Sequence, residues 1–252
     1  GVREHAMAAI SNGLAICGLR PFASTFLVFS DYMKPAIRMS ALMNLPVTYI
    51  FTHDSISIGK DGPTHQPIEQ LSMLRSIPNL NVYRPADVNE IIGVWNHIIN
   101  NNGPSAIVLS RNAYPAIETS SIELVNKGAY IVHKEKNKLD AILIATGSEV
   151  SVALEISKVL EKEKIHLRVV SMPCMSLYEK NNEEYKESIL PAGYRKIVIE
   201  FGSSCCWYKY VYGDKYLINI NTFGKSGSKE DVLENFKLDT DSIKNFIKKI
   251  LK

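Results

Sequence analysis

The sequence lacks the features that would place it at once among membrane or nucleic-acid-binding proteins. No apolar run approaches the ~18 residues that a membrane-spanning helix needs. The net charge of +3 is too small to favour a nucleic acid, and the first residues, GVREHAMAAI, do not form a charged and then apolar leader. We therefore expect neither a membrane nor a nucleic acid as a partner, and a cytoplasmic location, or an organelle if a targeting segment lies upstream.

Cysteine is scarce, and its spacing fits no zinc-binding pattern. Only four are present: Cys17, Cys174, Cys205 and Cys206. Disulfide geometry is hard to close across one peptide bond, so adjacent Cys205 and Cys206 are not expected to bridge each other. Reduced thiols in a cytoplasmic or organelle-interior protein account for this composition most simply.

The chain does not begin with Met, and a helical pattern starts almost at once. We expect a helix over residues 3–18, with Glu4 in its first turn, where a carboxylate suits the helix dipole. Small residues dominate one face, so something should pack closely on it. That face carries Ala6, Ala9, Ile10, Gly13, Leu14 and Cys17. An abrupt start of this kind suggests a fragment of a longer protein.

Apolar runs alternate with helical patterns along the rest of the chain, which predicts parallel sheets covered by helices on both faces. Strands are expected at residues 21–27, 46–51, 80–83, 105–110, 129–133, 140–145, 166–171, 196–201 and 216–220. Helices are expected at residues 31–45, 66–77, 88–101, 150–161, 228–236 and 239–252, with Asp87 as an N-cap.

The periodicity disappears over residues 112–127, which we interpret as an interdomain linker. The predicted fold class is therefore α/β with two domains, each a mostly parallel sheet flanked by helices. The first domain would cover residues 1–111 and the second residues 128–252. At 46% hydrophobic residues, the chain can bury a core in each.

The longest polar connection lies between a predicted strand and helix, at residues 51–69, FTHDSISIGKDGPTHQPIE. A plain strand-to-helix connection needs about 2–6 residues. Loops at the carboxyl ends of strands are where α/β proteins place ligands, although a polar surface loop with turn-forming Gly and Pro is an equal alternative on composition alone.

Two other patterns each leave two interpretations open. Phe26, Phe29 and Tyr32 recur every three residues, so they form either core or a surface that clasps a flat ring. The turn at residues 146–149, Thr-Gly-Ser-Glu, could hold an anion on backbone N–H groups, but a turn that caps the following helix is the better interpretation.

Taken together, the motifs resemble the transketolase family over nearly the whole chain. The matching strings are GVREHAM (residues 1–7), TFLVFSDY (25–32), FTHDS (51–55), GKDGPTHQP (59–67), AIVLSR (106–111), ATGSEV (145–150), VVSMP (169–173), WYKY (207–210) and TFGKS (222–226). GKDGPTHQP is the most specific of them.

The resemblance implies thiamine diphosphate as the cofactor and transfer of a two-carbon ketol unit between sugar phosphates, the transketolase reaction of the pentose phosphate pathway. Glu4 matches the catalytic carboxylate that hydrogen-bonds the aminopyrimidine ring. Phe26, Phe29 and Tyr32 match the aromatic pocket around that ring. The first domain would thus be the pyrimidine-binding domain, incomplete at its amino end, and the second the transketolase C-terminal domain.

Four residues match positions that line the family's substrate channel. Asp61 would bind a sugar hydroxyl, and His65 would act beside the reacting carbon, suited to proton transfer by a pKa near neutrality. His53 and Arg111 would hold the phosphate, which a guanidinium fork fits well. Without the resemblance, a buried structural histidine and a surface ion pair are the better interpretations of His53 and Arg111.

The family's GDG…N motif, which holds the diphosphate and Mg²⁺ or another divalent cation on an upstream domain, does not occur here. We therefore expect no metal ligand in this chain and no activity from it alone. Lys60 stands where the family usually has an acidic residue. The resemblance also implies a homodimer, with the cofactor between subunits and Glu4 near the interface.

Other members of the superfamily remain alternatives. Dihydroxyacetone synthase shares most of these motifs, whereas 1-deoxyxylulose-5-phosphate synthase is disfavoured by GKDGPTHQP. A non-catalytic subunit that completes a partner's active site is an alternative of a different class. No catalytic role is expected in the second domain, where Trp207, Tyr208 and Tyr210 are interpreted as packing residues.

Overall fold

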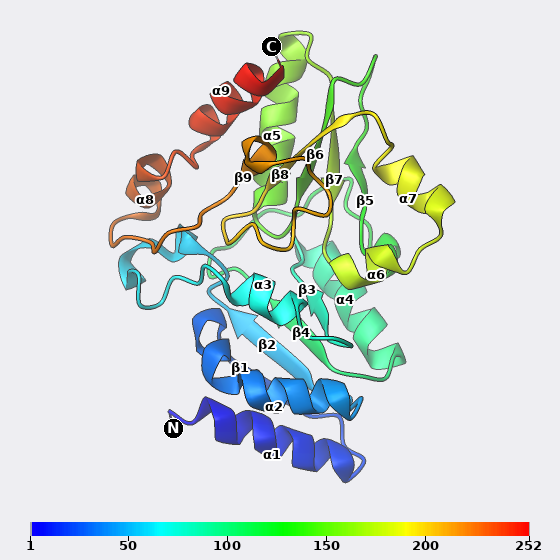
Figure 1. Ribbon diagram of the computed structural model, residues 1–252, viewed down its shortest axis with the longest axis vertical. Helices are drawn as coiled ribbons and strands as arrows, with labels where there is room; N and C mark the ends of the chain where they lie inside the picture. The colour runs from blue at the N-terminus through cyan, green and yellow to red at the C-terminus, as the bar shows by residue number, and fades with distance from the viewer. Residues whose placement is uncertain (1, 252) are drawn as a thin grey trace.

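Two sheets, each with its own helices, build the molecule. The structure is a computed structural model that describes residues 2–251; Gly1 and Lys252, the outer ends of the predicted domains, lie outside the described residues. Figure 1 shows the two halves stacked along the long axis, the amino-terminal half in blue to green and the other in green to red. This arrangement confirms the predicted α/β fold with two domains.

The first sheet is wholly parallel in the part of the chain that the structure describes, as predicted. Its spatial order is β1-β2-β4-β3. The bounds are β1 Phe22–Phe26, β2 Thr48–Thr52, β3 Asn81–Tyr83 and β4 Ser105–Val108. Apolar side chains on both faces of β4 are buried, which is the pattern of a strand covered on two sides.

Four helices accompany this sheet within residues 2–251: α1 Glu4–Ile16, α2 Ser30–Leu42, α3 Gln70–Arg75 and α4 Val88–Asn100. Asp87 caps α4 as predicted, because its carboxylate accepts the N–H of Glu90. The predicted helix over residues 66–77 begins four residues late. The reason is that the side chain of Gln66 binds loop carbonyls, and that of Gln70 accepts the N–H of Ile68.

The face of α1 that packs against the rest of the chain differs from the small-residue face that the sequence shows. Ala8 and Asn12 are buried, whereas Ile10 is 64% exposed and Leu14 is 41% exposed. The amide of Asn12 donates to the carbonyl of Ala36 in α2 at 2.8 Å. A buried polar residue thus contributes to this contact beside Ala8, and hydrophobic periodicity alone does not indicate such a residue. The small-residue face is exposed in this single chain, so the expectation that something packs closely on it stays a prediction.

The second sheet has the spatial order β5-β7-β6-β8-β9. Its strands are β5 Tyr130–His133, β6 Ala141–Ala145, β7 Leu167–Ser171, β8 Arg195–Ile199 and β9 Leu217–Ile218. The edge strand β5 runs antiparallel to β7, and the other pairs are parallel. The sheet is therefore mostly parallel, as predicted, with one reversed edge.

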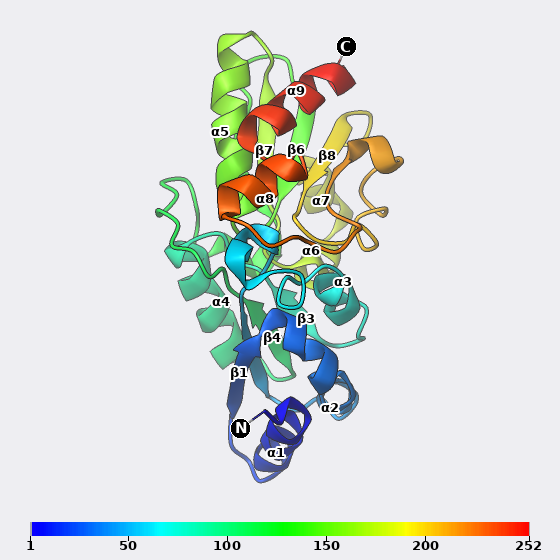
Figure 2. The ribbon, with the colours of Figure 1, turned by 90° about the vertical axis from the view of Figure 1, so that its left-hand side faces the viewer.

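Helices α5 Glu149–Lys162, α8 Lys229–Asn235 and α9 Thr240–Leu251 occupy the predicted segments of the second half. Two short helices, α6 Met175–Glu179 and α7 Glu183–Ile189, were not predicted because neither is long enough to show a period. Figure 2 shows α5, α8 and α9 on one side of the sheet. The exact domain boundaries and the linker 112–127, which contains a 3₁₀ turn at Leu124–Lys127, stay predictions.

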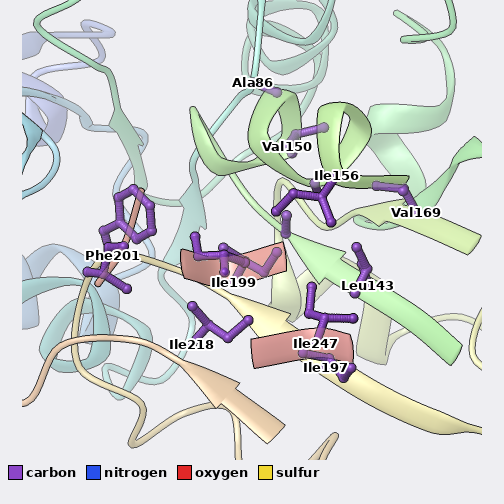
Figure 3. Packing of buried hydrophobic residues seen from close by; sticks show 14 of the residues in the cluster. Ala86, Leu143, Val150, Ile156, Val169, Ile197, Ile199, Phe201, Ile218 and Ile247 are labelled. Carbon is purple, nitrogen blue, oxygen red and sulfur yellow. The ribbon is translucent and has the colours of Figure 1, made fainter. Parts of the chain in front are cut away.

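The core of the second sheet extends into the first half. Ile56, Ile68 and Ala86 belong to the same buried cluster as residues of β6, β8 and α5. Figure 3 shows Ala86 in this cluster with Val150 of α5. Burial of each isoleucine contributes roughly 1.5–3 kcal/mol. The polar loop that follows β2 is therefore fixed against the second domain.

Trp207 and Tyr210 are packing residues, as predicted. Trp207 is fully buried, and its ring lies 5.8 Å from that of Tyr210. Tyr208 is different: it is 48% exposed, and its hydroxyl donates to Asp214 at 2.7 Å. The interpretation of Tyr208 as a packing residue was therefore wrong.

Candidate active site

The loop after β2 contains three residues whose backbone has a positive φ. His53 adopts a left-handed conformation with φ of 63°, and Gly59 and Gly62 have φ of 67° and 77°. Residues Ile56–Asp61 form a 3₁₀ segment that bends at Gly59. Left-handed backbone costs a non-glycine residue about 1–3 kcal/mol and persists only where the surroundings impose it. His53 is therefore held in place by its neighbours.

The second domain supports this loop from behind. A Cβ at Gly59 would lie 2.9 Å from the backbone nitrogen of Lys229, so only glycine fits there. The amide of Gln66 donates to the carbonyl of Gly59 at 3.1 Å and to that of Lys225 at 2.9 Å. The TFGKS string of the second domain thus lies directly against the GKDGPTHQP loop of the first.

Three aromatic rings form a continuous wall where β1 turns into α2. Phe26 and Phe29 stack with centroids 5.9 Å apart, and Phe29 and Tyr32 stack at 6.2 Å. The spacing of three residues reflects the 3₁₀ turn at Leu27–Phe29 between the strand and the helix. Tyr32 is 62% exposed and the two phenylalanines are half-buried, so the wall presents an open apolar face.

Both histidines of the loop lie against this wall. The ring of His53 stacks on Phe26 with centroids 3.6 Å apart. His65 meets Phe29 edge-on at 5.5 Å, and its Nδ1 lies 2.9 Å from the hydroxyl of Thr64. Histidines from two parts of one loop are therefore brought to the same aromatic surface.

Asp61 and Arg111 complete the cluster. An Asp61 carboxylate oxygen lies 3.9 Å from Nε2 of His53 and 3.9 Å from Nε of Arg111. The Arg111 side chain is 52% exposed, so this pair alone contributes little to stability. Lys60, beside Asp61, is also exposed.

The environment of His53 favours its neutral form. Burial lowers the pKa of His53 from 6.5, and the nearby Arg111 lowers it further, while Asp61 and Asp54 oppose the shift. A neutral imidazole at neutral pH can accept or donate a proton with little cost.

Glu4 is the one predicted site residue that the structure does not join to this cluster. It is half-buried in the first turn of α1, as predicted. Among residues 2–251 its carboxylate forms no ion pair. The structure thus assembles Phe26, Phe29, Tyr32, His53, His65, Asp61 and Arg111, and leaves Glu4 apart.

Sequence reasoning missed a buried charge cluster behind the loop. Arg84 is fully buried and binds Asp54 at 2.6 Å; it also binds Glu149, which belongs to the second domain. Glu200 pairs with Arg75 at 2.8 Å. Burial raises the pKa of Glu149, although Arg84 opposes this. The only signal in the sequence was an arginine directly after a buried strand.

The turn at residues 146–149 does not act as predicted. Ser148 stands at the N-cap of α5, but its side chain makes no capping bond and instead donates to Glu149 at 2.7 Å. A Cβ at Gly147 would lie 2.8 Å from Nε of Arg84. The turn therefore encloses the Arg84 guanidinium, so neither the capping interpretation nor the anion interpretation is needed.

No group of three or more His, Cys, Asp or Glu side chains within the described range 2–251 is arranged to hold a metal ion. None of the helices described is both long and apolar enough to cross a bilayer.

Comparison with known proteins identifies the family. Residues 1–116 match the family described as transketolase, pyrimidine binding domain, and residues 128–239 match the transketolase-like TK C-terminal domain. The chain is 48% identical to the transketolase of Bacillus subtilis, over 100% of this chain and 39% of the relative. It is also 48% identical to that of Aquifex aeolicus, over 97% and 36%. The chain belongs to the transketolase family, and it spans less than two fifths of the length of these relatives.

Solved structures of transketolases superpose closely on this chain. The transketolase of Leishmania mexicana superposes with a TM-score of 0.94 at 38% identity, covering 100% of this chain and 37% of that one. A Pichia stipitis transketolase in complex with sedoheptulose 7-phosphate gives 0.93 at 41%, with the same coverage. A structure described as a split gene transketolase, inactive beta4 tetramer, gives 0.83 at 24%, covering 100% and 82%. That last likeness shows the fold alone.

Proposed function

We propose that this chain forms the pyrimidine-binding side of a thiamine-diphosphate-dependent transketolase site, where a two-carbon ketol unit passes from a ketose phosphate to an aldose phosphate. The observation that carries the proposal is the assembly of His53, His65, Asp61 and Arg111 beside one aromatic wall. The Pichia stipitis relative, described in complex with sedoheptulose 7-phosphate, supports sugar phosphates as the substrate class.

The aromatic wall suits the cofactor. Phe26, Phe29 and Tyr32 leave a flat apolar face partly open, which fits an aminopyrimidine ring. Bound thiamine diphosphate would supply a centre that stabilises a carbanion. Glu4 would hydrogen-bond the ring and hold its proton. The diphosphate and a divalent cation such as Mg²⁺ would be held outside this chain.

The charged side of the cluster suits a sugar phosphate. Arg111 offers a guanidinium that is half exposed, and His53 can add a second donor. Asp61 lies between them and would accept a hydrogen bond from a substrate hydroxyl. His65 would carry a proton at the reacting carbon, because an imidazole nitrogen can act as a general acid or base.

A homodimer and a cytoplasmic location belong to the same proposal. The outer face of α1 exposes Ile10 and Leu14, which supports contact with a second copy. In both ribbon views α1 lies at the end of the molecule remote from the second domain, so a partner could approach it freely (Figures 1 and 2).

The test is a holoenzyme in which the amino-terminal part of the Bacillus subtilis relative is joined ahead of this chain. With thiamine diphosphate and Mg²⁺, we expect ketol transfer from a ketose phosphate to an aldose phosphate. Glu4→Gln should lower the rate by about 100-fold or more, because general acid–base groups contribute on that scale. Glu184→Gln, in the first turn of α7, is the matched control and should keep full activity. A Glu4→Gln enzyme with unchanged rate would contradict the proposal.

A second candidate is a stand-alone subunit that completes a partner's site. Under this alternative, the chain without a joined amino-terminal part should gain activity when a separate diphosphate-binding chain is added.

Two related enzymes remain alternatives and are tested with other substrates. Dihydroxyacetone synthase differs in its acceptor, so the same assay with formaldehyde in place of an aldose phosphate tests that alternative. The alternative of 1-deoxyxylulose-5-phosphate synthase is tested with pyruvate as the donor.

A further inference from the structure

Arg84 stands at the centre of a buried cluster that joins the two domains behind His53. Its side chain has no exposed surface. Nε and Nη2 donate to one carboxylate oxygen of Asp54, at 3.1 and 2.6 Å. Nη1 and Nη2 both donate to Glu149 of the second domain, and Glu200 lies 3.9 Å from Nη1. One guanidinium therefore binds carboxylates from both domains.

The backbone of the second domain closes around this arginine. The N–H of Arg84 donates to Pro173, and its carbonyl accepts the N–H of Gly147 at 3.0 Å. Gly147 has φ of 58°, and a Cβ there would press on the guanidinium. Arg84 is thus enclosed by the ATGSEV turn and by the end of the VVSMP segment.

One residue of the cluster, Asp54, is the sequence neighbour of a site residue. Asp54 directly follows His53, the residue whose left-handed backbone has to be imposed by its surroundings. The Asp54 carboxylate, bound to Arg84 by two hydrogen bonds, fixes the residue that directly follows His53. The imidazole of His53 stacks on Phe26, with ring centroids 3.6 Å apart.

We propose that Arg84 and Asp54 are positioning residues for His53, and that the second domain acts on the phosphate end of the site through Glu149 and Arg84. This inference rests on the proposed function for its kinetic readout. A cluster that served only to join the domains would place no requirement on the orientation of His53, and this difference makes the two roles separable.

The kinetic test uses Glu149→Gln and Arg84→Lys in the holoenzyme. Neither replacement can retain the forked pairing that binds two carboxylates at once. We expect the KM for phosphorylated substrates to rise about tenfold with kcat within about twofold, and the KM for an acceptor without phosphate to stay unchanged. A fall of kcat alone, equal for both acceptors, would mean a merely structural role and overturn the proposal.

Tyr130→Phe is the matched control. It also removes a buried hydrogen bond between the domains, since Tyr130 of β5 donates to Glu90 of α4 at 2.8 Å, but it has no contact with Asp54. We expect this variant to keep the wild-type KM for phosphorylated substrates. A rise equal to that in Glu149→Gln would attribute the effect to general loosening of the domains and overturn the proposal.

A spectroscopic test on the 252-residue chain needs no activity. The Cε1–H resonance of His53 should be shifted by the ring current of Phe26. In folded Glu149→Gln and Arg84→Lys the resonance should move toward that of a solvent-exposed histidine, and in Tyr130→Phe it should not move. An unmoved resonance in both folded variants overturns the proposal. If the holoenzyme transfers no ketol unit, the proposed function fails while this measurement still decides the positioning of His53.

Discussion

At the scale of single residues, His53 connects most of the site. Its ring packs on Phe26, and Asp61 lies near its outer nitrogen. Burial lowers its pKa below 6.5. The folded protein therefore binds fewer protons than the unfolded chain near that pH. The stability contributed by neutral His53 is fully present above pH 6.5 and is lost as the pH falls through the window below it.

We expect the two charged neighbours of His53 to move its titration midpoint in opposite directions. Asp61→Asn should lower the midpoint further, because the carboxylate favours the charged imidazole, whereas Arg111→Ala should raise it. A histidine NMR titration measures both. His97, whose pKa is also lowered by burial, is the internal control and should not respond. Shifts of the same sign in the two variants would contradict the placement of His53 between these charges.

At the scale of elements, the loop of the first domain depends on a segment of the second. A Cβ at Gly224 would collide with the side-chain amide of Gln66, which donates a hydrogen bond to the carbonyl of Gly59 in the loop. At Gly227 the nearest atoms lie 3.5 Å away, an ordinary contact. The two glycines are a matched pair, three residues apart in one segment.

Gly224→Ala should lower the free energy of unfolding by about 1–3 kcal/mol, the usual cost of overpacking. It should also speed hydrogen exchange in the loop over residues 56–66. Gly227→Ala should do neither. Thermal or denaturant unfolding with exchange detected by mass spectrometry measures both effects. Equal behaviour of the two variants would mean that Gln66 does not anchor the loop.

At the scale of the whole molecule, the exposed face of α1 should mediate the proposed dimer. Ile10→Asp with Leu14→Asp should give a folded monomer, because charges placed in an apolar contact remain unpaired. Light scattering should report a mass near 28.2 kDa for this variant of the chain and twice that for the wild type. Ile99→Asp, at a similarly exposed site on α4, should leave the dimer intact. A monomeric wild type would contradict the dimer proposal.

The sequence predicted most elements of the fold, because period and length are local properties. The alternation of strands and helices, the cap at Asp87 and the long loop after β2 are all confirmed. The helices α6 and α7 were missed because a helix of one or two turns shows no period. The aromatic and polar site residues were predicted from motifs. The structure brings all of them except Glu4 together in one cluster.

The amino-acid sequence by itself was enough to predict the family, the two α/β halves and the chemistry available to the loop. Each of these depends on a local pattern or on a motif. Only the tertiary structure decided which charges are buried. Arg84, Asp54 and Glu149 look like ordinary surface residues in the sequence, yet they are enclosed together between the domains. The physical reason is that a buried charge is stable only beside its partner, and these partners come from segments far apart in the chain.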